Sequence, residues 1–181
     1  MKLLLHTCCA PCAIYPLEQL RKKGYEVTGF FYNPNIHPFV EYKKRKQAVA
    51  DFAKVTQIDK VIYPEYRPAE FFQEVNLKED FPGRCSICWS LRLARTAQAA
   101  KEIGCNYFST TLLVSPYQNQ ELLKKIGEEI AKEAEVNFYY EDFRPGFKKA
   151  HDEAHAQGIY CQDYCGCVYS EVERCRKSQK P

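Results

Sequence analysis

The sequence lacks the long apolar run of a membrane protein. Its longest purely aliphatic run is Leu3–Leu5, far short of the roughly 20 apolar residues that a spanning helix needs. Met1 and Lys2 resemble the start of a signal peptide, but His6 and Thr7 interrupt the apolar stretch before a cleavable segment can form. We therefore expect a cytoplasmic protein with no membrane partner.

The sequence also lacks a strong excess of either charge, internal repeats, low-complexity stretches and linkers. Its 26 basic and 23 acidic residues give a net charge of only +3, which is compatible with a nucleic-acid partner without arguing for one. With 181 residues, 45% of them hydrophobic and 27% charged, the chain is expected to form one globular domain. Only residues 174–181 are interpreted as a loose basic tail.

Cysteine is less abundant than in a protein held together by disulfides. The chain has 10 cysteines among 181 residues, below the roughly 8–10% typical of such scaffolds, and it is long enough to fold without them. In a reducing cytosol we expect thiols that are free, metal-bound or redox-active. Cys105 and Cys175 stand alone, and we interpret them as a buried small hydrophobe and an incidental thiol.

Strand-like and helix-like segments alternate along the chain. Five alternations predict an open parallel sheet covered on both faces, which binds ligands at the carboxyl ends of its strands. A loop-rich insertion is expected around residues 81–86. The expected strands are residues 2–5, 26–32, 60–63, 106–114 and 136–140, and the expected helices are residues 15–23, 39–54, 87–103, 120–134 and 147–157.

The loop after the first strand, His6-Thr7-Cys8-Cys9-Ala10-Pro11-Cys12, contains no glycine. Its backbone therefore cannot wrap closely around a phosphate, and ATP is not expected there. The spacings Cys9-x-x-Cys12 and Cys85-x-x-Cys88 instead suit a soft metal, and a helix start at the second pair favours thiolates. Spacing alone leaves zinc and an iron–sulfur cluster open, and the long step from Cys12 to Cys85 favours the cluster.

A third cysteine group lies near the end of the chain, at Cys161, Cys165 and Cys167. The glycine between the last two lets their sulfur atoms approach, either as a redox-active disulfide or as metal ligands. Asp163 is a hard oxygen donor that suits a mixed thiolate–carboxylate iron site or, equally, a helix cap.

Polar and basic residues supply further candidates. A basic run on an expected helix is either a solvated face or a phosphate-binding surface, with Phe39 and Tyr42 placed to stack a base. Polar residues that follow the expected strands suit either a ligand pocket or turns. The basic run is Lys43, Lys44, Arg45 and Lys46, and the polar candidates for substrate binding are Asn33, His37, Tyr117, Gln118 and Arg144.

Six ordered motifs that span nearly the whole chain resemble one family, the cobalamin-independent epoxyqueuosine reductases known as QueH. The motifs are His6–Cys12, Tyr32–Pro38, Cys85–Cys88, Thr110–Gln118, Asp142–Arg144 and Tyr164–Cys167. The resemblance implies reduction of the epoxide of epoxyqueuosine at the wobble position of tRNA to give queuosine. The expected partners are thus this tRNA and an electron donor of unknown identity.

The resemblance also implies a set of site residues. It implies a redox-active pair at Cys165 and Cys167, able to form a disulfide bond, and a [4Fe–4S] cluster on Cys8, Cys9, Cys85 and Cys88. An additional mononuclear iron beside the cluster is a hypothesis, with Cys12, Cys161 and Asp163 as its candidate ligands.

The expected fold is a single α/β domain with an open parallel sheet of about five strands, Rossmann-like and nucleotide alpha-hydrolase-like. It carries a cysteine-rich insertion and C-terminal segment. Two alternative functions remain open from the residues: a structural zinc protein that binds RNA without redox chemistry, and a thiol–disulfide oxidoreductase without metal.

Overall fold

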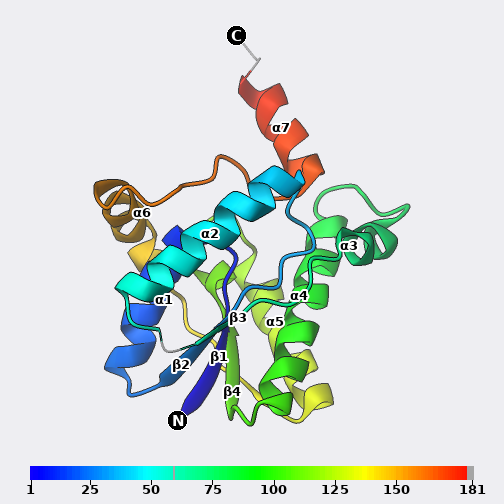
Figure 1. Ribbon diagram of the computed structural model, residues 1–181. Coiled ribbons are helices and arrows are strands. Elements are labelled where there is room, and N and C mark those ends of the chain that lie inside the picture. Colours follow the sequence, from blue (N-terminus) through cyan, green and yellow to red (C-terminus); the bar gives the residue numbers. More distant parts are fainter. Residues whose placement is uncertain (59, 179–181) are drawn as a thin grey trace.

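The computed structural model describes residues 1–58 and 60–178, and a five-stranded parallel sheet lies at its centre (Figure 1). The central strand β1 pairs with β2 on one side and β4 on the other, so that the order is β3-β2-β1-β4-β5. The apolar residues of β1 are buried because both faces of the sheet are covered. The strands are β1 (Lys2–His6), β2 (Glu26–Phe30), β3 (Val61–Ile62), β4 (Tyr107–Thr110) and β5 (Asn137–Phe138).

Helices form a layer on each face of this sheet (Figure 1). One layer contains α1 (Ala10–Lys22), α2 (Phe39–Val55) and α6 (Phe147–Ala156), and α1 packs against both of the others. The other contains α3 (Pro68–Val75), α4 (Gly83–Glu102) and α5 (Gln120–Ala134). None of the helices in the described residues is both long and apolar enough to cross a bilayer.

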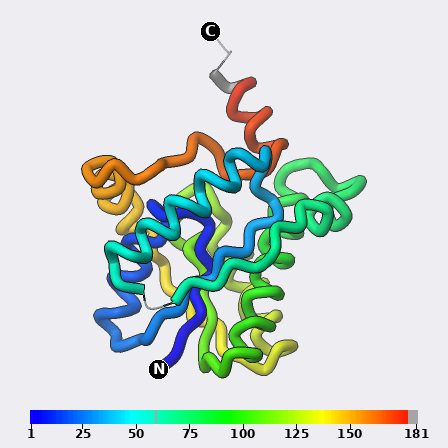
Figure 2. Tube along the Cα trace, in the orientation of Figure 1, coloured from blue at the N-terminus to red at the C-terminus, as the bar shows by residue number. Residues whose placement is uncertain are grey.

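The last helix, α7 (Val168–Ser178), projects from the side of the molecule where the strands have their carboxyl ends. The segment between α6 and α7 runs across that side, past the start of α2 (Figure 2). The chain therefore brings Cys161, Cys165 and Cys167 to the carboxyl ends of the strands, where the first cysteine loop also begins.

The open five-stranded parallel sheet confirms the predicted fold class. Residues 111–114, expected to continue a strand, instead form the 3₁₀ helix η1 (Thr111–Val114), because the Thr110 side chain accepts a hydrogen bond from the Leu112 amide at 3.1 Å. The sequence patterns also failed to predict α3 and α7. Residues 174–178, expected as a loose tail, belong to α7, whereas residues 179–181 of that tail lie outside the described residues.

Candidate functional site

Three cysteines meet where β1 passes into α1. One ligand atom from each of Cys8, Cys9 and Cys12 lies within 4.8 Å of the others, and the Cys8 and Cys9 sulfur atoms are 3.8 Å apart. Cys9 caps α1 with extended backbone and no side-chain cap bond, so the first amides of the helix face this group. The positive end of the helix dipole favours thiolates at this position.

The side chain of Thr111 fixes Cys8 from the first residue of η1, directly after β4. Its hydroxyl oxygen accepts a hydrogen bond from the Cys8 amide at 3.1 Å and lies 3.3 Å from the Cys8 sulfur, to which it can donate. Hydrogen bonds from Cys12 and Cys9 hold the pKa of Cys8 well below its usual range, and Thr111 lowers it further. Cys8 is thus the first thiolate of the group.

His6 supports this loop in its neutral form. Its Nε2 donates to the Tyr32 carbonyl at 3.2 Å, and its Nδ1 accepts from the Thr110 hydroxyl at 2.9 Å. Complete burial lowers the pKa of His6 to about 4, with the nearby charge of Arg92 acting in the same direction. The two bonds tie the end of β1 to both neighbouring strands.

A second pair of cysteines comes from α4. Cys85 lies in the first turn of the helix and Cys88 in the next, because α4 begins at Gly83, four residues before the predicted start. Burial raises the pKa of Cys85 to about 11 and that of Cys88 to about 12. Cys88 belongs to the same small apolar cluster as Cys167, so the second and third cysteine groups lie close together.

A buried arginine joins the three cysteine groups. Arg92 is 1% exposed, and its Nε donates to the Cys88 carbonyl at 3.1 Å. Its Nη2 has no hydrogen-bond partner among the described residues. Burial lowers the pKa of Arg92, but the electrostatic effect of nearby cysteines raises the pKa by more. The four cysteines that exert this effect are Cys88, Cys165, Cys8 and Cys85.

A second buried arginine holds the turn at Cys165 and Cys167. Arg45, 1% exposed, pairs with Glu41 at 2.7 Å and donates to the carbonyls of Tyr164 and Cys165 at 3.1 and 2.9 Å. Within this turn Gly166 has φ of +143°, and a β-carbon there would lie 3.3 Å from Nη1 of Arg45. Glycine is therefore required where the turn packs against the arginine.

The turn leaves its two thiols in different surroundings. Cys165 is exposed, whereas Cys167 is buried in the apolar cluster that contains Cys88. Both are free thiols in this structure, so the expected disulfide bond is not formed. An accessible thiol next to a shielded one is an arrangement that suits thiol–disulfide exchange.

The three candidate ligands for a second iron are not brought together. Cys12 lies with Cys8 and Cys9, but Cys161 lies with two histidines of α6. The residue between Cys161 and Asp163 does face the thiol group: the Nε2 atom of Gln162 is 3.0 Å from the Cys9 sulfur. Asp163 itself is exposed.

The predicted substrate-binding residues fall in two places. Asn33 is buried and donates to the Thr7 carbonyl at 3.0 Å, and the amide of His37 donates to the Gly166 carbonyl at 2.8 Å. The Asn33 oxygen and both ring nitrogens of His37 have no partner among the described residues. The other three lie towards α6 or on the surface: Tyr117 is 82% exposed beside Phe147, Gln118 is partly buried, and Arg144 pairs with Asp142.

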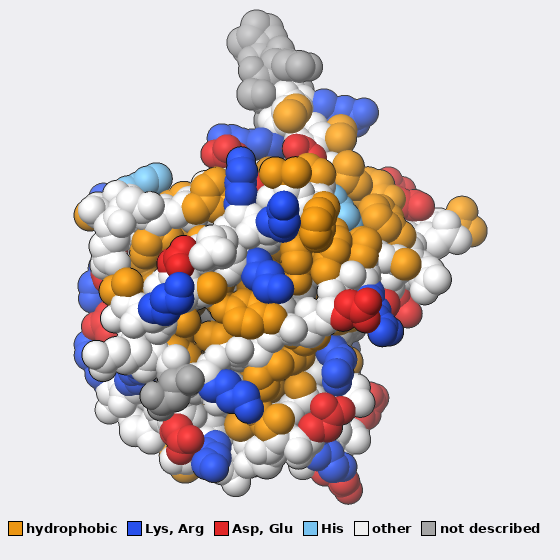
Figure 3. All heavy atoms as spheres, in the orientation of Figure 1, with side chains coloured by type: hydrophobic (Ala, Val, Ile, Leu, Met, Phe, Trp, Pro, Cys, Tyr) orange, Lys and Arg blue, Asp and Glu red, His pale blue; other side chains and the backbone are white. Residues whose placement is uncertain are grey.

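The predicted basic run divides between surface and interior. Lys43 and Lys44 are exposed and Lys46 is partly buried, each with its ammonium group 5.3–5.7 Å from the centre of an aromatic ring. Arg45, in the middle of the run, faces the thiol-rich turn instead. Figure 3 shows basic side chains interspersed with apolar ones over α2.

Comparison with known proteins identifies the family of this chain. A family model described as "Epoxyqueuosine reductase QueH" matches residues 3–173. The chain belongs to the QueH family. A relative of that description from Dehalococcoides mccartyi is 39% identical over 99% of this chain and 98% of its own length, and one from Thermotoga maritima is 38% identical over 96% and 92%.

Membership of the QueH family makes the chain an oxidoreductase, as the description of its relatives states. A crystal structure described as a predicted subunit of tRNA methyltransferase from Methanocaldococcus jannaschii has a TM-score of 0.58 at 12% identity, covering 86% of this chain and 74% of that one. At this identity the likeness concerns the fold alone, an open parallel sheet covered by helices.

Proposed function

We propose that this QueH protein reduces the epoxide of epoxyqueuosine at the wobble position of tRNA, giving queuosine, the last step of queuosine biosynthesis. The observation that carries the proposal is the convergence of three cysteine groups around the guanidinium of Arg92, whose Nη2 has no partner among the described residues. The redox function fits such a thiol centre and the family membership. A tRNA substrate implies action in the cytoplasm.

The donor set fits a [4Fe–4S] cluster held by Cys8, Cys9, Cys85 and Cys88. Four thiolates are the usual ligands of such a cluster, and here they come from the starts of two helices, α1 and α4. Arg92 supplies the positive charge that a buried anionic group requires, since its Nη2 has no partner among the described residues. When bound, the cluster would supply electrons one at a time.

The proposed reduction balances with a dithiol as the two-electron source. Both C–O bonds of the epoxide break, a C=C bond forms, and the oxygen leaves as water with two protons. Cys165 and Cys167 lose two electrons and two protons and form a disulfide. An external thiol or other reductant, the unidentified electron donor, must then reduce that disulfide before the next turnover.

Buried polar groups beside the thiols are proposed to orient the nucleoside. The Asn33 oxygen and the His37 ring nitrogens lack partners among the described residues, so a substrate hydroxyl or amine can satisfy them without displacing a protein hydrogen bond. His37 stacks on Phe72 at 4.5 Å, which fixes the plane of its ring. Tyr117, Gln118 and Arg144 are proposed to contact parts of the RNA farther from the reacting carbons.

The surface of α2 is proposed to bind the tRNA backbone. Lys43, Lys44 and Lys46 offer ammonium groups to phosphates, and Phe39, 54% exposed, offers a ring on which a base can stack. Arg45 does not contribute to this surface, because Glu41 and two backbone carbonyls occupy its guanidinium. It holds the Cys165 turn beneath the same helix.

A mononuclear iron beside the cluster remains part of the proposal, with Cys12 as its protein ligand. This thiol lies within 4.8 Å of Cys8 and Cys9, whereas Cys161 and Asp163 lie outside that group. An iron ion is a Lewis acid that would stabilise negative charge on the departing oxygen.

The direct test uses anaerobically purified, iron-loaded protein with tRNA that carries epoxyqueuosine and a chemical reductant. Nucleosides released from the tRNA are identified by mass spectrometry. The proposal predicts conversion to queuosine, and no conversion by a Cys85→Ser variant of equal folding. A zinc-containing protein that binds the tRNA but leaves the epoxide intact would instead support the structural zinc alternative.

A further inference from the structure

A second group of metal-ligating side chains lies outside the thiol centre, between α6 and the segment that follows it. His151 and His155 are one helical turn apart on α6, so both rings project from the same face. Cys161 comes from the segment beyond the helix, after a turn at Gly158 with φ of +64°. One ligand atom from each of the three lies within 4.8 Å of the others.

These separations suit a small ion. A tetrahedral zinc with bonds of about 2.0–2.3 Å holds its ligand atoms roughly 3.5 Å apart, so modest side-chain rotations close the site. The two histidines of α6 supply only two ligands. The turn at Gly158 lets the following segment bring Cys161 to them as the third. We propose that His151, His155 and Cys161 bind a Zn²⁺ ion, with water as the fourth ligand.

The surroundings favour the neutral imidazoles that a metal needs. His151 is partly buried with its ring centre 4.4 Å from that of Phe147, and burial lowers its pKa, as does the charge of His155. His155 is exposed, which leaves one side of the site open to solvent for the water ligand. Figure 3 shows histidine atoms at the surface over α6.

The donor types select the metal. Two imidazoles and one thiolate suit a borderline ion such as Zn²⁺, whereas Mg²⁺ and Ca²⁺ prefer oxygen ligands. Burial and the charge of the exposed Asp163 carboxylate raise the pKa of Cys161. A bound cation would offset both effects, and the nearby carboxylate would attract it.

This site is separate from the thiol centre yet linked to it by the chain. Cys161 faces α6, and its neighbour Gln162 places Nε2 3.0 Å from the Cys9 sulfur. Cys165 follows three residues later, in the turn that Arg45 holds. An ion on Cys161 would therefore anchor to α6 the segment that carries the exposed thiol of the redox pair.

The test compares metal content in iron-loaded protein purified without oxygen. Wild type and variants are exposed to a slight excess of Zn²⁺, passed through a weak chelating resin, and analysed for zinc and iron. Wild type is expected to retain one more zinc per chain than a His155→Ala variant, with equal iron in both. Lys148→Ala, an exposed change on the same helix, serves as the matched control and is expected to retain the zinc.

X-ray absorption at the zinc edge gives the second readout, with a shell of two nitrogens and one sulfur expected. A Cys161→Ala variant should lose the sulfur shell and the extra zinc together. The proposal is overturned if wild type and His155→Ala hold the same amount of zinc, or if the sulfur shell survives in Cys161→Ala. Either result would leave the proposed reduction of epoxyqueuosine standing, because that proposal depends on the thiol centre and its iron.

Discussion

Both ends of the parallel sheet have a buried cysteine nearby, but the surroundings of the two cysteines differ. At the carboxyl ends, Cys88 is 8% exposed, shares an apolar cluster with Cys167 and lies beside the charge of Arg92. At the amino ends, Cys105 is also 8% exposed and burial raises its pKa as it does that of Cys88, but it lies in the main apolar core, where Lys2 and Glu26 are the charges that act on it. Burial alone therefore does not distinguish the two cysteines, whereas thiol neighbours and a buried cation do.

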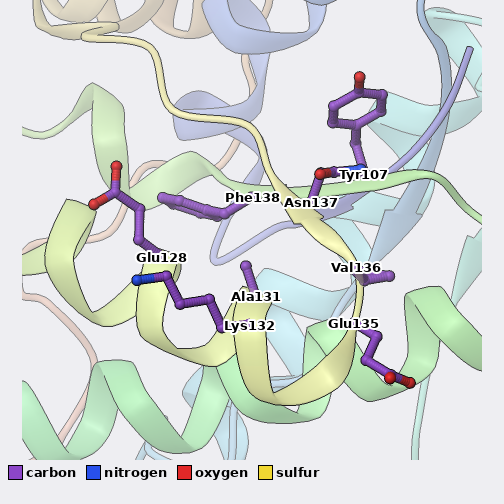
Figure 4. Close-up of a pocket in the computed structure, with 8 residues that line it drawn as sticks. All are labelled: Tyr107, Glu128, Ala131, Lys132, Glu135, Val136, Asn137 and Phe138. Carbon is purple, nitrogen blue, oxygen red and sulfur yellow. The ribbon is translucent and has the colours of Figure 1, made fainter.

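The amino ends also show that an opening in the surface does not locate a reactive site. A pocket of about 610 Å³ lies beside the edge strand β5, where the Phe138 ring and the aliphatic side chains of Ala131 and Val136 form its apolar wall (Figure 4). Its lining contains no cysteine or histidine, and its charged groups come from exposed residues such as Glu128 and Lys132. The unpaired buried polar atoms of Asn33, His37 and Arg92 lie instead around the thiol centre.

The largest expected effect comes from matched alanine substitutions at the two ends. Cys88→Ala removes a proposed cluster ligand and is expected to abolish epoxyqueuosine reduction and lower the iron content, since an iron–sulfur cluster depends on all its thiolates. Cys105→Ala removes an equally buried sulfur and is expected to retain both. Activity assays and iron analysis of the two purified variants test this contrast. Equal activity and equal iron content in both would contradict the proposed difference between the two cysteines.

The next effect separates metal ligands from the redox pair. Cys165→Ser is expected to keep the iron content of wild type but lose sustained turnover, because a single thiol cannot complete a disulfide. The measurement is product formed per chain beside iron per chain. A lower iron content in this variant would instead indicate that Cys165 is a metal ligand.

A smaller effect is expected from the charge at the centre of the thiol groups. Arg92→Gln leaves anionic ligands without a buried cation and should lower activity or cluster retention by roughly 10–100-fold, the usual cost of removing a supporting partner of a metal site. Arg92→Lys keeps the charge and should recover part of the loss. If Arg92→Gln matched wild type in both readouts, the arginine would be only a packing residue.

The smallest effect concerns the lysines of α2. Replacing Lys43, Lys44 and Lys46 by glutamine should weaken tRNA binding by about tenfold, if each exposed ion pair contributes roughly 0.5 kcal/mol. The slope of log affinity against log salt should fall by about one for each lysine–phosphate ion pair removed. The matched control replaces three exposed lysines of α5, Lys124, Lys125 and Lys132. Equal weakening in both triple variants would mean that the α2 surface has no special role.

The fold and the first two cysteine groups could be predicted from the sequence because local patterns encode them. Alternating strands and helices predict the sheet, and two Cys-x-x-Cys spacings predict grouped cysteines at helix starts. The role of Arg45 could not be predicted, since a run of four basic residues does not show which one faces inward. Its i,i+4 spacing from Glu41 was the available signal.

The grouping of distant residues could not be predicted from local sequence patterns either. Cys161 lies with α6 and Gln162 with Cys9 because of the path that residues 158–167 take across the carboxyl ends, which depends on tertiary packing. Arg92 belongs to the site because it lies one turn after Cys88 on α4. A position four residues after a cysteine on a predicted helix is a signal that could have identified it.

Analysis of iron, acid-labile sulfide and zinc in anaerobically purified protein, together with a visible spectrum, decides whether the thiol centre holds an iron–sulfur cluster. We predict a brown protein that loses its colour in air and contains at least about four irons and four sulfides per chain, as a [4Fe–4S] cluster requires. A colourless protein that contains neither sulfide nor iron, with zinc bound to Cys8, Cys9, Cys85 and Cys88, would refute the proposed cluster.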